Sequence, residues 1–177
     1  MERTIFALFL VFLISPAKAA DSINRYPVRT DHLTDTDSGY VLASEARWES
    51  LYFLHVEGRQ EYRSDGTFCG RLPVGHYELY KINTSYGAVT SDDPFTFEVV
   101  AGQRNYIGTV SPPWVSDSKK FAEQREKNPA VRKYDLSKFM KVAYDYTVFD
   151  QMTALGKKFQ KRCKDVDISE FTTQLMK

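Results

Sequence analysis

The sequence has few of the groups on which enzymes rely for chemistry at neutral pH. Its 177 residues include only three histidines, His32, His55 and His76. Histidine is the one side chain whose ordinary pKa lies between pH 5 and 8. None of the three has the HxH, HExxH or HxxxH spacing of a metal site. If His55 and His76 lie on neighbouring strands, we expect two partly buried, hydrogen-bonded imidazoles and no metal.

Motifs that carry catalysis are also missing. The chain has no GxSxG, no CxxC and no glycine-rich phosphate loop. The acidic pair Asp92 and Asp93 falls where turn chemistry alone explains it. The sequence therefore predicts no catalytic residue, no cofactor and no bound metal.

Long apolar runs are absent except at the start, from Ile5 to Ile14. That run is about half of the roughly 20 residues that a membrane-spanning helix needs. Arg3 precedes it, and Ala17 and Ala19 follow in the spacing of a signal-peptidase site. We therefore expect residues 1–19 to be a signal peptide, and the mature protein to be periplasmic or extracellular without a transmembrane anchor.

The chain has no large excess of charge, so composition predicts no nucleic-acid partner, but the two halves differ. Residues 20–116 carry 8 basic and 13 acidic side chains, whereas residues 117–177 carry 14 basic and 9 acidic ones. The favoured interpretation is mutual attraction between a basic tail and an acidic domain. The alternative is an exposed patch for an anionic envelope component or an acidic protein. That patch would comprise Lys157, Lys158, Lys161, Arg162 and Lys164.

The two cysteines, Cys69 and Cys163, predict one disulfide, because an even count in an exported protein favours pairing. In the chain-entropy model such a long closed loop adds about 4 to 5 kcal/mol of stability. The alternative is two buried free thiols.

Aromatic and β-branched residues recur in short runs from residue 39 to 113. The clearest are LPVGHYELY at residues 72–80 and FTFEVVAGQRNYIGTV at residues 95–110. Six or seven strands between turn signals predict an antiparallel β-sandwich of Greek-key type. Pro73 and Gly75 would bend the chain, and Tyr77 would form a tyrosine corner, bonding to upstream backbone.

The pattern changes past residue 113. We expect residues 20–38 to form a polar arm, residues 39–113 the sandwich and residues 114–177 a helical segment packed against it. Helices are predicted at residues 117–128, from Phe149 to Cys163, and after a capping box at Asp167 and Glu170. Residues 83–94 read as a loop, and residues 134–146 fit either a helix or a strand.

The two β motifs carry a resemblance to a family. LPVGHYELYKI followed by PFTFEVVAGQRNYIGTV resembles a pattern of uncharacterised bacterial exported proteins. More distantly, the region is similar to carboxypeptidase-regulatory and transthyretin-like sandwich domains. The resemblance implies a binding, spacer or accessory module and supplies no catalytic residues.

Together these features predict an exported, non-catalytic binding protein of the bacterial envelope. One alternative is a hydrolase whose site is assembled from dispersed histidines and carboxylates. A second alternative is an inhibitor or immunity-type protein, which an exposed apolar groove beside the basic helix would favour.

Overall fold

The structure, a computed structural model, describes residues 30, 32–45, 50–85, 87–111, 131–135, 143–164 and 166–177. The expected signal peptide, most of the polar arm and the helix expected at residues 117–128 lie outside these residues. In the described part, no helix is long and apolar enough to span a bilayer.

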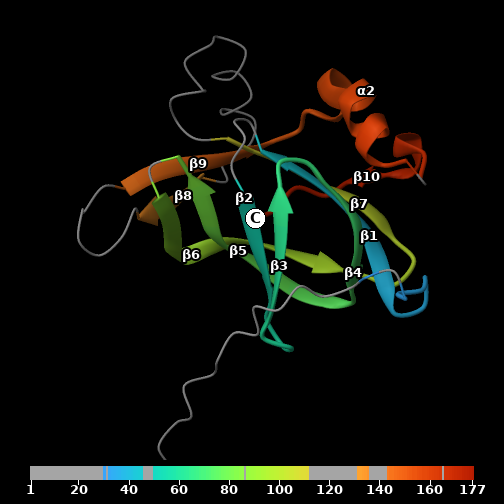
Figure 1. Cartoon of the computed structure of the whole chain (residues 1–177), viewed down its shortest axis with the longest axis horizontal. Helices are drawn as coiled ribbons and strands as arrows, with labels where there is room; N and C mark the ends of the chain where they lie inside the picture. The colour runs from blue at the N-terminus through green and yellow to red at the C-terminus, as the bar shows by residue number, and fades with distance from the viewer. Residues whose placement is uncertain are drawn as a thin grey trace, which may run out of the picture.

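The fold is mainly β, as expected, and the strands form one continuous sheet (Figure 1). Its hydrogen-bonded order is β3-β2-β5-β6-β8-β9-β7-β1-β4, with β10 also paired to β7. The strands are β1 (Ser38–Glu45), β2 (Ser50–His55), β3 (Gln60–Asp65), β4 (Phe68–Pro73), β5 (Gly75–Thr84), β6 (Gly87–Val99), β7 (Arg104–Ser111), β8 (Val131–Asp135), β9 (Ala143–Phe149) and β10 (Thr172–Thr173).

This architecture corrects the prediction of a sandwich. The two ends of the path, β3 and β4, are successive in the chain and separated only by Gly66 and Thr67, so the sheet curls into a nearly closed barrel. A barrel removes most of the exposed strand edge that an open sheet would leave. Two pairings are parallel, those of β7 with β1 and with β10, where an antiparallel arrangement was expected.

The gap between β6 and β7 is filled by segments from the C-terminal part of the chain. Over one half, the hairpin β8–β9 pairs with both strands. Over the other half, the last six residues lie between them. Lys177 and Thr96 exchange both backbone hydrogen bonds at 2.9 and 3.0 Å, and the Met176 amide donates to the Ile107 carbonyl at 3.1 Å. The end of the chain therefore completes the barrel.

The main core lies inside the barrel. It gathers inward-facing residues of the strands with Met176 of the tail, whose side chain is 1% exposed. Phe53, Tyr77 and Phe97 meet there, with ring centroids 5.2 to 5.4 Å apart for the two pairs that include Phe97. The register of β5 shifts between Leu79 and Lys81, so Ile82 rather than Lys81 joins the core. Residues 87–94 belong to β6, not to the expected loop.

The bend between β4 and β5 is built from the residues that the sequence singles out. The Tyr77 hydroxyl donates to the carbonyl oxygen of Pro73 at 2.9 Å, which is the contact of a tyrosine corner. Gly75 has a φ of 141°, and a Cβ there would lie 2.4 Å from Nε2 of His55. Glycine is required at this position by both conformation and space.

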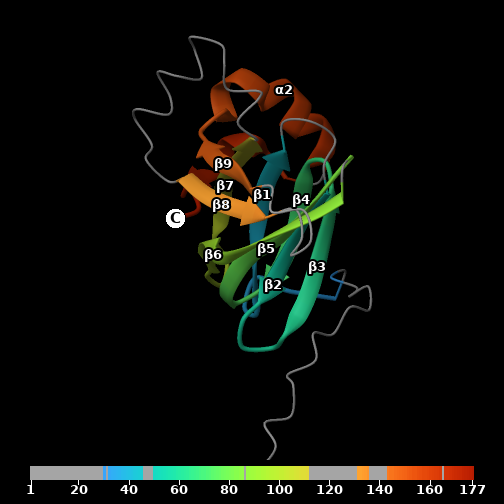
Figure 2. The ribbon, with the colours of Figure 1, turned by 90° about the vertical axis from the view of Figure 1, so that its left-hand side faces the viewer.

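One helix, α2 (Met152–Arg162), packs on the outside of the barrel. Figures 1 and 2 place it toward one end, with the turn between β2 and β3 at the other. Phe159 and Cys163 join a second apolar cluster with Leu42 and Tyr106, on β1 and β7. The expected disulfide is present, and Cys163 bonds to Cys69 on β4 with the two Cα atoms 5.5 Å apart.

The rest of the C-terminal segment is less helical than expected. Phe149 ends β9 instead of beginning the helix. Asp167 does cap, accepting from the Ser169 amide at 2.9 Å, but only a 3-10 turn (Ile168–Glu170) follows, and the chain then extends into β10. Pairing with β6 and β7 satisfies the backbone of the last residues better than an isolated helical turn would.

Replacing Tyr77 with Phe should lower the free energy of unfolding by about 1 kcal/mol, because the hydrogen bond to Pro73 is lost while the ring remains. Urea denaturation measures the change. Tyr40→Phe is a matched control, since the described residues offer its hydroxyl no hydrogen-bond partner. Equal stability of the Tyr77→Phe variant and the wild type would show that the corner bond contributes nothing.

Replacing Met176 with Ala should lower the free energy of unfolding by about 2 to 4 kcal/mol, because the side chain is fully buried in the barrel core. Gln174→Ala, an exposed change in the same tail, should leave the stability unchanged within about 0.5 kcal/mol. If denaturation gives the two variants the same stability, the tail does not form part of the cooperative core.

Candidate functional site

The helix α2 separates an apolar face from a basic one. Met152, Leu155 and Phe159 recur at helical spacing and face the barrel. Lys158, Lys161 and Arg162 lie on other faces and are exposed. Two of these cations are in the last turn, where positive charge interacts favourably with the helix dipole. The same pattern that packs the helix therefore presents cations beside the barrel.

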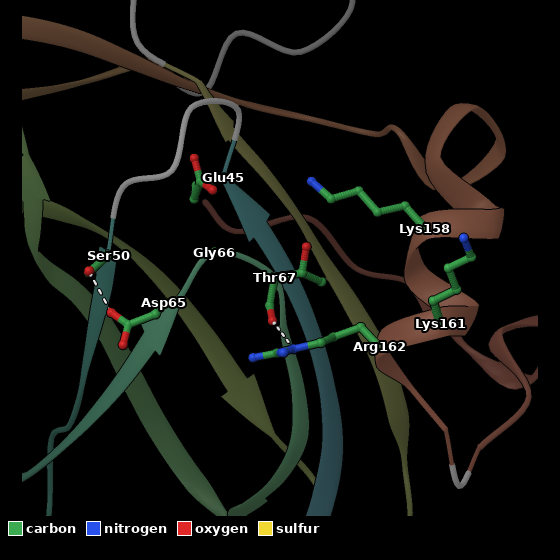
Figure 3. A pocket seen from close by; sticks show the side chains of 8 residues that line it. All are labelled: Glu45, Ser50, Asp65, Gly66, Thr67, Lys158, Lys161 and Arg162. Carbon is green, nitrogen blue, oxygen red and sulfur yellow. Dashed lines mark hydrogen bonds between the residues drawn. The ribbon is translucent and has the colours of Figure 1, made fainter.

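These three cations line a cavity of about 530 Å³ between α2 and one end of the barrel (Figure 3). Across from them lie Glu45, at the end of β1, and Asp65, at the end of β3. Ser50, Gly66 and Thr67 complete the described lining. The site thus combines a basic helix with the residues that connect β3 to β4.

The cations are not neutralised by close acidic neighbours. Within the described ranges, no carboxylate lies within 4 Å of Lys158, Lys161 or Arg162, nor of Lys157 or Lys164. Arg162 donates through Nε to the Thr67 carbonyl at 3.0 Å, which fixes its guanidinium at the edge of the cavity. Its two terminal nitrogens have no partner among the described residues. An incoming anion would find these donors unoccupied.

A buried hydroxyl also lines the cavity without a partner. Thr67 is 7% exposed, and its Oγ1 makes no hydrogen bond within the described structure. In Figure 3 this oxygen points to the space between Glu45 and Lys158. A buried hydroxyl without a partner costs about 1 to 3 kcal/mol. A ligand that accepts or donates a hydrogen bond here would recover that cost.

On the opposite side of the cavity, the carboxylate of Asp65 already has hydrogen-bond partners. Asp65 Oδ1 accepts from the Ser50 hydroxyl at 2.7 Å and from Nε of Arg63 at 2.8 Å. The hydrogen bond from Ser50, with that from Arg63, holds the pKa of Asp65 below its usual value. The field of Arg162 acts in the same direction. Asp65 is therefore ionised at neutral pH, and its charge is already shared with Arg63.

The structure brings together only part of the basic patch expected from the sequence. Lys158, Lys161 and Arg162 line this cavity, whereas Lys157 and Lys164 are exposed outside it. Thr67, Asp65 and Glu45 were not predicted as site residues. One signal could have indicated them, because the disulfide places the residues before Cys163 beside those before Cys69. Pro73, Gly75 and Tyr77 lie outside this cavity, at the β4–β5 corner.

The histidines that the hydrolase alternative needs do not line this cavity. His55 is at the far end of β2 from Ser50. Its Nδ1 accepts from the Gly58 amide at 2.8 Å, so Nε2 carries the proton and donates to the Val74 carbonyl at 3.0 Å. His76 bonds through Nδ1 to Glu57 at 2.6 Å. Among the described residues, neither ring contacts a serine, threonine or cysteine side chain.

Comparison with family models, with curated proteins and with solved structures found no match to this chain. The chemistry of the cavity therefore carries the functional argument.

The pair His76–Glu57 should make stability depend on pH. The hydrogen bond from His76 lowers the pKa of Glu57 to about 2, and the same bond raises the pKa of His76. The stabilisation from Glu57 is lost as pH falls from 4.5 through about 2. That from His76 is complete below about 6.5 and is lost as pH rises through the raised pKa.

A double-mutant cycle with Glu57→Gln and His76→Ala checks this expectation. The coupling free energy from urea denaturation should be largest between about pH 4.5 and 6.5 and should decline on both sides. A coupling that stays constant from pH 3 to pH 9 would contradict an ionic contribution from this pair.

Proposed function

We propose that this chain is an exported, non-catalytic binding protein of the bacterial envelope, and that it binds an anionic ligand between α2 and the β3–β4 connection. The expected signal peptide supports export. The disulfide also supports it, because such bonds persist in oxidising compartments.

The observation that carries the proposal is the convergence of three cations on a cavity with a buried hydroxyl, where the described residues offer neither a carboxylate within 4 Å of the cations nor a hydrogen-bond partner for the hydroxyl. Lys158, Lys161 and Arg162 are three and four residues apart on one helix, a spacing at which like charges destabilise the helix by about 0.2 to 0.5 kcal/mol per pair. An anion bound between them would remove that repulsion and accept their N–H groups. Charge-assisted hydrogen bonds of this kind are about twice as strong as neutral ones.

Attraction between a basic tail and an acidic barrel explains less of this arrangement than anion binding does. Arg162 does act on Asp65 through space, as the lowered pKa of that carboxylate indicates. Yet the cation that contacts Asp65 is not on the helix, since Nη2 of Arg63 lies 2.8 Å from Asp65 Oδ1. The apolar cluster, the disulfide and the hydrogen bond from Arg162 to the Thr67 carbonyl attach α2 to the barrel. Among the described residues, Lys158 and Lys161 make no contact of this kind, so attraction to the barrel does not account for them.

The set of lining groups favours binding over catalysis. Three cations, two carboxylates and two hydroxyls surround the cavity. The Ser50 hydroxyl donates to an ionised Asp65 that Arg63 also engages, so that carboxylate is a weak base toward it. The described lining of the cavity contains no apolar residue, so these residues do not form the exposed apolar groove that would favour an inhibitor-type protein.

Orthophosphate is a suitable probe of the site. We expect isothermal titration calorimetry to show that the mature protein binds orthophosphate. The double variant Lys158→Gln, Lys161→Gln should bind it about 10- to 100-fold more weakly, because the charge-assisted hydrogen bonds from these lysines are lost. The affinity of the wild type should fall as sodium chloride rises, because exposed charges are screened.

The variant Lys157→Gln supplies the matched control. It removes the same charge from the same helix, but Lys157 does not line the cavity. We expect its affinity to stay within about twofold of the wild type, as screening of a remote exposed charge predicts. Equal losses in Lys157→Gln and in the double variant would show general attraction to a basic surface and would refute a site in this cavity.

A further inference from the structure

A second cavity of about 270 Å³ lies on the other side of Arg162. Arg162 lines both cavities, so the two are adjacent. Arg71 and Lys164 also line the second cavity, with Tyr40 and the two disulfide-bonded cysteines. No acidic residue is among its described lining, in contrast to the first cavity.

Among the described residues, the cations of the second cavity have N–H donors without a hydrogen-bond partner. Arg71 is oriented by its contact with Asp35, 2.5 Å from Nη1, and by the ring of Tyr40, 4.7 Å from its guanidinium carbon. A second bond from Nη1 reaches the Ser38 hydroxyl at 3.3 Å. Within the described residues, Nε and Nη2 of Arg71 have no partner, and Lys164 has none either. The side chain is thus positioned while part of its hydrogen-bonding capacity stays open.

The disulfide fixes the two cavities relative to one another. Cys163 directly follows Arg162, and its bond to Cys69 attaches the end of α2 to β4 at a Cα separation of 5.5 Å. Cys163 is 3% exposed and packs with Phe159 and Val166. The disulfide therefore fixes the backbone at the end of α2 beside β4, which lowers the entropic cost of binding.

We propose that the anion site extends across Arg162 into this second cavity, and that its ligand is an elongated molecule with at least two anionic groups. This inference rests on the proposed function and specifies its ligand. One group would lie near Lys158 and Lys161, and the next near Arg71 and Lys164, with Arg162 bonding to both. Guanidinium groups bind phosphate and carboxylate alike in bidentate geometry.

Linking two anionic groups makes binding of the second group intramolecular, so an oligoanion should bind more tightly than its monomer. Two pairs of probes distinguish the anionic group: orthophosphate against tripolyphosphate, and acetate against N-acetylated triglutamate. We expect at least one oligoanion to bind about tenfold or more above its monomer in calorimetry. The pair with the larger gain identifies the group that the site prefers.

Lys164→Gln tests the second cavity, since Lys164 is exposed and lines only that one. This variant should lose most of the gain of the oligoanion over its monomer and keep the melting temperature of the wild type. Lys157→Gln, which lines neither cavity, should keep the gain. If both variants keep it equally for both oligoanions, or if no oligoanion gains in the wild type, the extension is wrong.

Failure of the extension is separable from failure of the proposed function. With only the extension wrong, Lys158→Gln, Lys161→Gln still weakens orthophosphate binding relative to Lys157→Gln. With the proposed function wrong, that difference disappears as well, whatever the oligoanions do.

Discussion

The covalent bond between Cys69 and Cys163 is the constraint on which the arrangement of the candidate site depends. It joins β4 to the residue after α2 across 94 positions of sequence. Both partners are preceded by residues that line the first cavity, Thr67 on one side and Arg162 on the other. Because both segments approach the same bond, the basic turn of the helix lies beside the β3–β4 connection. Loss of this bond would leave the apolar cluster and the hydrogen bond from Arg162 to Thr67 to position the cations.

The positions of the strands could largely be predicted from the sequence, but their pairing could not. Alternation of buried and exposed residues marks a strand without indicating its neighbours. The parallel pairing of β1 with β7 and the insertion of the tail beside Thr96 are therefore not visible in local patterns. The last residues carry one strongly buried side chain, Met176, which is too few for a periodic signal. A sandwich was the economical prediction because the barrel is closed by tertiary pairings, those of the β8–β9 hairpin and of the last residues with β6 and β7.

The candidate site was predictable in its charges and not in its shape. The run of lysines and Arg162 stands out in the sequence, and the disulfide could be expected from two cysteines in a chain predicted to be exported. Whether a basic helical face meets solvent or a cavity depends on the elements packed beside it. Thr67 has no distinguishing sequence context, since an unpartnered buried hydroxyl is defined only by its surroundings.

The acidic residues of the first cavity bear on selectivity. Glu45 and Asp65 face the cations, so an anion that occupies the cavity must stay on the α2 side or meet like charge. Like-charge juxtaposition disfavours incorrectly placed ligands, and specific sites combine such repulsion with attraction to the correct ligand. The described lining of the second cavity has no acidic residue, and the nearby Asp35 is already paired with Arg71. Arg162 connects the two cavities. A ligand with successive anionic groups is therefore directed along one path, past Arg162 and toward Arg71, whereas a diffuse polyanion that binds any basic surface gains nothing from the carboxylates. Because carboxylates line only the first cavity, the proposed selectivity depends on the positions of the charges and not on the net charge of the surface.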